Sequence, residues 1–95
     1  MSGAEAPAIH NNDADSRFET TMDQETAFVE YKRTGDTIEL THTIVPPRIE
    51  GRGVGTALAE YALHFARTNS LNVIPTCAFI AAHIASHPEH ADLVA

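Results

Sequence analysis

The segment Val45-Pro-Pro-Arg-Ile-Glu-Gly-Arg-Gly-Val-Gly-Thr56 decides the fold, because it separates a strand pattern from a helix pattern. Pro46 and Pro47 end the strand before it, since proline removes a backbone donor and fixes φ. The glycines that follow let the backbone approach a ligand closely. The helix that begins near Gly53–Gly55 presents backbone N–H groups without internal partners. With the helix dipole, these groups form a site for an anion such as phosphate.

Three strand patterns precede this segment. Residues 17–22 alternate, residues 27–32 are rich in aromatic and β-branched side chains, and residues 37–45 alternate again. Short turns at 23–25 and 34–36 predict an antiparallel meander. Alternation in the third strand is expected to place four side chains on one face: Ile38, Leu40, His42 and Ile44.

A helix, a short strand and a second helix follow the segment. The first helix is expected to run to about Asn69, because its apolar residues recur at spacings of three and four. We expect a strand at Leu71–Pro75 and a helix at Cys77–Ser86, which Pro88 ends. The order β-β-β-α-β-α predicts an α+β fold, with two main helices packed on an antiparallel-dominated sheet.

Length and composition limit the class of protein. The 95 residues are enough for one domain, which we expect at 16–95 after a disordered tail at 1–15. A net charge of −7, with a single Lys, argues against nucleic acid and anionic membranes as partners. One cysteine makes no internal disulfide, and residues 1–15 lack the features of a secretory signal. We therefore expect a cytoplasmic protein.

Two common phosphate-binding motifs do not fit the glycine-rich segment. The P-loop requires a Lys after its last glycine, and none is present. The dinucleotide motif requires G-x-G-x-x-G, whereas Gly51, Gly53 and Gly55 give G-x-G-x-G. The run Arg48-Ile-Glu-Gly51-Arg-Gly53 instead satisfies [RQ]-x-x-G-x-[GA], the pyrophosphate loop of acyl-CoA-dependent N-acetyltransferases.

Four motifs together resemble the minimal single-domain GNAT-like N-acetyltransferase family. They are His42-Thr43-x-Val45-Pro46, the R-x-x-G-x-G-x-[GA] loop, Pro75-x-Cys77-x-Phe79 and the His-Pro-Glu run near the end of the chain. The resemblance covers about residues 17–93. It implies a GNAT-like fold and acetyl-CoA or CoA as the bound cofactor.

The resemblance also implies which residues bind acetyl-CoA. The pantetheine arm would lie along Thr43, Ile44 and Val45, at the end of the third strand. The pyrophosphate would lie on the loop and the helix start, and Arg48 and Arg52 would add charge-assisted hydrogen bonds. The residues implied there are Arg48, Gly51, Arg52, Gly53, Val54, Gly55 and Thr56.

Cys77 and His42 are the candidate catalytic residues. Cys77 begins a predicted helix, where the dipole lowers a thiol pKa. The resemblance implies that Cys77 lies near the CoA sulfur, as an acyl-accepting nucleophile or a proton donor, whereas the alternative is a packed core cysteine. His42 is a candidate base or a packed histidine. Ile44 stands where the family often has Glu, and the second helix has Phe79 but no Tyr as an acid.

Three histidines near the end of the chain raise the question of a metal site. His83, His87 and His90 form H-x3-H-x2-H, with Glu89 between the last two. Pro88 interrupts the helix there, and the pattern lacks the Glu of H-E-x-x-H. We therefore expect no metal.

The best-supported function is an N-acetyltransferase that moves an acetyl group from acetyl-CoA to a primary amine of unknown identity. The short sheet lacks elements that wall the acceptor site in longer relatives, so a protein partner is a candidate to complete that site. One alternative is a CoA-binding regulatory or interaction module without chemistry of its own. The other is an interaction domain whose glycine loop is only a turn.

Overall fold

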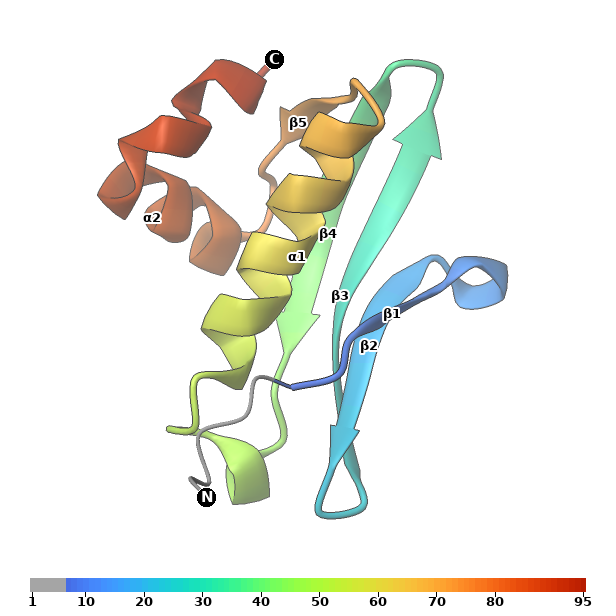
Figure 1. Cartoon of the computed structure of the whole chain (residues 1–95), viewed down its shortest axis with the longest axis vertical. Helices are drawn as coiled ribbons and strands as arrows, with labels where there is room; N and C mark the ends of the chain where they lie inside the picture. Colours follow the sequence, from blue (N-terminus) through green and yellow to red (C-terminus); the bar gives the residue numbers. More distant parts are fainter. Residues whose placement is uncertain (1–6) are drawn as a thin grey trace.

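The computed structural model describes residues 7–95, in which a five-stranded sheet forms one layer and the helices lie on one side of it (Figure 1). The strands lie side by side in chain order: β1 (His10–Asn12), β2 (Arg17–Met22), β3 (Glu25–Thr34), β4 (Thr37–Ile44) and β5 (Asn72–Ile74). All neighbours are antiparallel except β4 and β5, which are parallel. Helix α1 (Val54–Thr68) lies along β4 on one face of the sheet, and α2 (Ala78–Ser86) lies beside α1 (Figure 1). The α+β prediction is confirmed.

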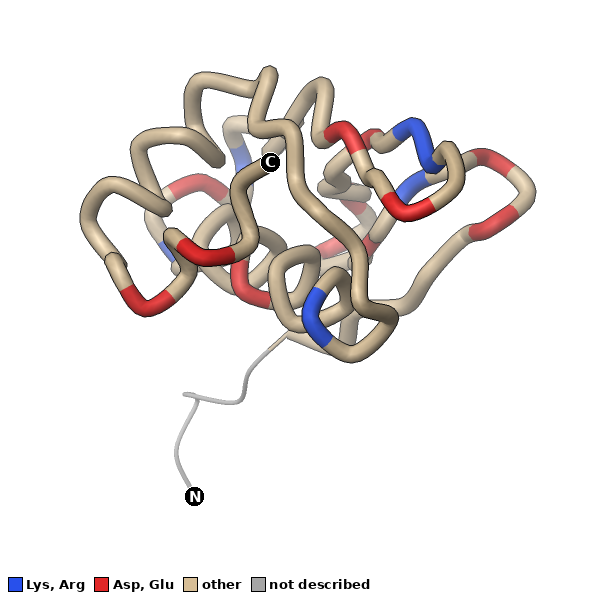
Figure 2. Tube along the Cα trace, turned by 90° about the horizontal axis from the view of Figure 1, so that it is seen from above, with Lys and Arg blue, Asp and Glu red and all other residues tan. Residues whose placement is uncertain are grey.

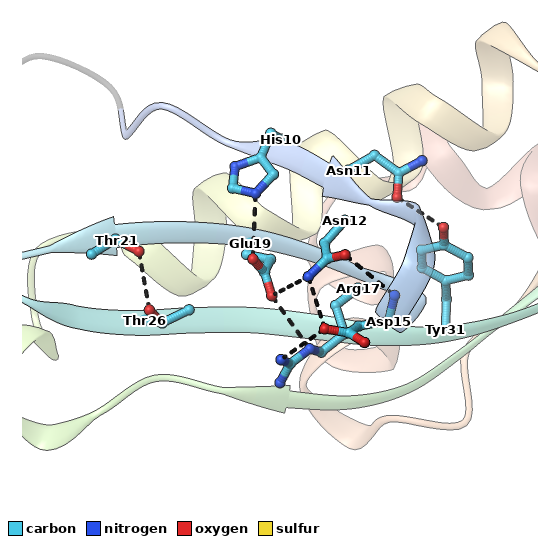
Figure 3. A network of polar contacts seen from close by, with 9 residues as sticks. All are labelled: His10, Asn11, Asn12, Asp15, Arg17, Glu19, Thr21, Thr26 and Tyr31. Atoms are coloured by element: carbon cyan, nitrogen blue, oxygen red, sulfur yellow. Dashed lines mark hydrogen bonds and ion pairs between the residues drawn. The ribbon is translucent and has the colours of Figure 1, made fainter.

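Strand β1 corrects the expectation of a disordered tail over residues 1–15. Residues 1–6 of that tail lie outside the described residues, but His10–Asn12 pairs with β2 and the 3-10 turn η1 (Asp13–Asp15) follows. Polar contacts hold this segment (Figure 3). Tyr31 Oη donates to Asn11 at 2.8 Å, and Asn12 Oδ1 accepts from the Asp15 N–H. A strand held by polar contacts shows no hydrophobic alternation in the sequence, so the pattern did not predict β1.

The apolar core lies between the sheet and α1. Phe18 is fully buried at its centre, stacked on Tyr31 with ring centroids 4.6 Å apart. From α1, Tyr61 and Phe65 contact the same ring with centroids at 5.3 and 4.9 Å. The helical stripe and the strand alternation therefore meet at one aromatic cluster.

Strand β4 contains one extra residue relative to β3. Glu30 pairs with His42, but the next residue of β3, Tyr31, pairs with Leu40, so Thr41 has no counterpart. Such a bulge reverses which face the following side chains take. Thr43 lies opposite the buried Val29 and thus faces α1.

The expected common face of Ile38, Leu40, His42 and Ile44 is therefore wrong. Ile38 and Leu40 are fully buried, whereas the His42 side chain is 69% exposed and Ile44 is 47% exposed. The bulge at Thr41 places the latter two on the face away from α1.

Strands β4 and β5 pair over only part of the length of β4. Their register joins Thr37–Glu39 to Asn72–Ile74, after which the chain leaves β5 and reaches α2 through residues 75–77. The second half of β4 therefore has a strand neighbour, β3, on one edge only among the described strands.

No helix in residues 7–95 has the length and apolar character of a membrane span.

We predict that Phe18→Ala lowers the free energy of unfolding by about 3–5 kcal/mol, because it removes the ring on which three aromatic side chains pack. Urea denaturation followed by circular dichroism measures this change. Phe79→Ala is the matched control, since Phe79 is 43% exposed, and we expect it to cost less than about 1.5 kcal/mol. Equal losses in the two variants would contradict the assigned core.

Candidate functional site

A groove of about 560 Å³ opens where β4 ends and α1 begins. Its volume lies in the range of small-molecule and cofactor sites. The lining residues come from the end of β4, the glycine loop, the first turn of α1 and α2: Thr43, Ile44, Val45, Glu50, Gly51, Gly53, Gly55, Thr56 and Phe79. Most of the predicted acetyl-CoA residues are thus brought together, whereas Glu50 and Phe79 were given no role by the sequence.

The divergence of β4 and β5 supplies one wall of the groove. The Cys77 N–H donates to the Leu40 carbonyl at 2.9 Å, which holds the start of α2 against β4 just past the last β4–β5 pair. Beyond Leu40, the free edge of β4 runs into Thr43, Ile44 and Val45, which line the groove. Backbone donors and acceptors on such an edge are available to an extended ligand.

The glycine loop supplies the opposite wall. Gly51 and Gly53 have φ of +80° and +78°, a left-handed conformation that side chains rarely adopt. A Cβ at either position would meet nothing within 4 Å. Gly53 is the N-cap of α1, and no side chain caps this end. The first bond of the helix runs from the Ala57 N–H to the Gly53 carbonyl, so the amides of Val54, Gly55 and Thr56 precede it.

Gly55 has a different role from the other two glycines. A Cβ there would lie 3.0 Å from the Phe79 ring of α2. Phe79 is partly exposed and lines the groove. Gly55 therefore lets the second helix approach the first closely enough to complete the groove wall. One sign in the sequence that Phe79 is important was its place in the Pro75-x-Cys77-x-Phe79 motif.

The two arginines of the loop do not line the groove in the described structure. Arg52 Nη1 forms an ion pair with Asp23 Oδ2 at 2.7 Å, and Arg48 Nε lies 3.7 Å from Glu25 Oε2. Both acids belong to the β2–β3 hairpin, and because it is distant from the loop in sequence, local motif spacing gives no sign of these pairs. The four side chains of these pairs are 34–66% exposed, and exposed pairs of this kind stabilise a fold weakly. Figure 2 shows the acidic positions spread around the described chain, with Lys and Arg between them.

Cys77 lies at the N-cap of α2, half-buried, with its Sγ 3.3 Å from Thr43 Oγ1. Burial by itself raises the thiol pKa, but hydrogen bonds from the Thr43 hydroxyl and from the Ile80 and Phe79 backbone outweigh it, and the net pKa is lowered. The bulge at Thr41 is what turns Thr43 toward this thiol.

His42 lies on the opposite face of β4 from Cys77, where its Nδ1 is 3.0 Å from Glu30 Oε1. Thr41 donates its hydroxyl proton to the same carboxylate. The hydrogen bonds from Thr41 and His42 lower the pKa of Glu30. A carboxylate at Nδ1 orients an imidazole and leaves Nε2 free. Glu30 is a functional candidate that sequence reasoning missed.

Outside the groove, the histidine motif forms a separate cluster. His83 and His90 both contact Glu60 of α1, and not the neighbouring Glu89. Neither belongs to the residues that line the groove.

Two comparisons with known proteins agree with this geometry. The family model for GCN5-related N-acetyltransferases matches residues 17–93. A solution structure of a GCN5-like protein from Staphylococcus aureus, described as a candidate N-acetyltransferase, matches with a TM-score of 0.71 and 26% sequence identity. That match covers 100% of this chain and 91% of the other.

We predict that Thr43→Val raises the pKa of the Cys77 thiol, because the variant keeps the side-chain shape but removes the hydroxyl beside Sγ. The rate of alkylation by iodoacetamide, measured against pH, should then reach its midpoint at higher pH than in the wild type. Thr43→Ser restores the hydroxyl and should restore the midpoint. An unchanged profile in Thr43→Val would contradict the proposed stabilisation of the thiolate.

Proposed function

The chain belongs to the GCN5-related N-acetyltransferase family, and we propose that its groove binds acetyl-CoA. One observation carries this proposal: the free edge of β4 lies beside the uncapped start of α1, in one groove. An extended pantetheine arm and an anionic pyrophosphate need these two features together.

The residues present fit the cofactor. In the proposal, the backbone of Thr43, Ile44 and Val45 pairs with the pantetheine arm along the free edge of β4. The backbone around the αL glycines and the first amides of α1 binds the pyrophosphate: Gly51, Gly53, Val54, Gly55 and Thr56. The open space above Gly51 and Gly53 leaves room for phosphate oxygens.

Arg48 and Arg52 would take part only after a change of partner. Each is held by a carboxylate of the β2–β3 hairpin, but these ion pairs are exposed and weak. A phosphate offers a stronger, charge-assisted contact to a guanidinium. We therefore propose that bound phosphate draws one or both arginines from Glu25 and Asp23.

The proposed reaction is transfer of an acetyl group to a primary amine. Acetyl-CoA supplies an activated acetyl thioester. Cys77, with its lowered pKa, is the proposed proton donor to the CoA thiolate or the acceptor of the acetyl group. His42, oriented by Glu30, is the proposed base that takes a proton from the amine. Because His42 lies on the open face of the sheet, the amine would approach from that side.

A second function has its own supporting observation. Ile44 is one of the residues that line the groove, its side chain is 47% exposed, and it stands at the position where the family often has Glu. An apolar group there offers no proton transfer, which favours a CoA-binding regulatory or interaction module.

For either function, we propose that a protein partner completes the side of the site where the acceptor would bind, because the short sheet lacks the elements that wall this side in longer relatives. We further propose a reducing compartment such as the cytoplasm, where Cys77 remains a thiol.

We predict that Gly53→Val abolishes the rise in melting temperature that CoA produces, because a β-branched side chain would occupy the space proposed for phosphate. Gly35→Val is the matched control. Gly35 also has positive φ (+56°) and open space at Cβ, but lies in the β3–β4 turn. Both variants should lose stability from backbone strain, and only Gly53→Val should lose the CoA effect. An equal CoA effect in both would overturn the site.

We expect intact-protein mass spectrometry to separate the two functions. After incubation with acetyl-CoA, a single acetyl adduct that is lost in Cys77→Ala and discharged by a primary amine indicates transfer through Cys77. Amine-dependent release of CoA without an adduct, diminished in His42→Gln, indicates direct transfer. Binding of CoA with neither result favours the non-catalytic module and would overturn the proposed transfer.

A further inference from the structure

A cluster of one carboxylate and two imidazoles joins three elements outside the groove. Glu60 comes from α1, His83 from α2, and His90 from the 3-10 segment η3 (Pro88–Leu93). His83 Nε2 and His90 Nε2 lie 2.5 and 3.0 Å from the same oxygen, Glu60 Oε2. The three candidate ligand atoms all lie within 4.8 Å of one another.

Packing holds these rings in place. The His83 and His90 side chains are 5% and 13% exposed. The His83 ring stacks on His87 with centroids 4.1 Å apart, and His87 Nδ1–H donates to the His83 carbonyl at 2.8 Å. Packing in the folded structure therefore positions the two imidazoles, and the partly exposed Glu60 carboxylate reaches both from α1.

Two imidazole nitrogens and a carboxylate oxygen suit a borderline divalent cation. Zn²⁺ bonds such atoms at about 2.0–2.2 Å, which places neighbouring tetrahedral ligands roughly 3.3 Å apart. To reach that value, the two contacts to Glu60 Oε2, at 2.5 and 3.0 Å, would lengthen, and the two histidine nitrogens, which lie within 4.8 Å of each other, would adjust to the same spacing. Glu60 is 46% exposed, so water has access to a fourth position.

We propose that Glu60, His83 and His90 bind a divalent transition-metal cation, with Zn²⁺ preferred, and that the bound ion ties α2 and η3 to α1. This departs from our expectation of no metal, which considered Glu89. The actual carboxylate lies 23 and 30 residues before the two histidines, so motif spacing does not reveal it. The proposal does not depend on acetyl-CoA binding.

The environment of His90 limits the affinity. Binding through Nε2 leaves the ring proton on Nδ1, and that atom is buried without a hydrogen-bond partner among the described residues. Metal-bound histidines usually donate this proton to an acceptor, and loss of such a contact weakens binding about 10- to 100-fold. We therefore expect a micromolar dissociation constant.

Isothermal titration of the tag-free protein with Zn²⁺ tests the site. We expect one ion per chain, at least about 10-fold weaker binding in Glu60→Gln and in His90→Ala, and a melting temperature raised by roughly 10–20 °C at 100 times the dissociation constant. His10→Gln is the matched control, because His10 also faces a carboxylate, Glu19, but has no second histidine in that contact.

The contrary results are equally distinct. No binding of Zn²⁺ up to millimolar concentration by the folded wild type would overturn the proposal. So would binding that Glu60→Gln and His90→Ala leave unchanged, or that His10→Gln removes. Circular dichroism of each variant confirms that it is folded, and Glu60→Gln keeps the size and a hydrogen-bond acceptor of the original side chain.

Discussion

The extra residue Thr41 in β4 is the constraint on which the rest of the site depends. Before it, Ile38 and Leu40 point into the core; after it, Thr43 faces α1 and His42 faces the open side of the sheet. Because the pairing of β5 with β4 ends at Glu39, the part of β4 that follows the bulge has a free edge where the groove opens. One local insertion thus aims a hydroxyl at Cys77, directs an imidazole to Glu30 and leaves backbone groups for a ligand.

Recognition of an anion by this acidic chain must be local. The net charge is −7, Glu50 lines the groove, and the two loop arginines are paired with hairpin carboxylates. Long-range attraction therefore contributes little to binding of a phosphate. The uncapped first turn of α1 and the two αL glycines remain as short-range donors. In this account, the backbone recognises the pyrophosphate and the arginines respond to it.

The sequence predicted the features that arise from local physics. Alternation located β2 and β4, aromatic and β-branched composition located β3, the apolar stripe located α1, and prolines and glycines located the loop between β4 and α1. The features missed depend on pairing between distant residues. Thr41 is a bulge only against β3, the loop arginines find Asp23 and Glu25 across the fold, and β1 forms through polar contacts such as Asn11 with Tyr31. Glu60 meets His83 and His90 only after the helices pack.

The most direct test of the account is a titration of the isotopically labelled protein with CoA, followed by amide chemical shifts in a two-dimensional nitrogen–proton NMR spectrum. We expect the largest shifts at Thr43–Val45 and at Gly51–Thr56, and small shifts in β1 and β2. That pattern would locate the ligand between the free edge of β4 and the start of α1. Saturable shifts centred elsewhere, or none at millimolar CoA, would contradict the central claim that this groove is an acyl-CoA site.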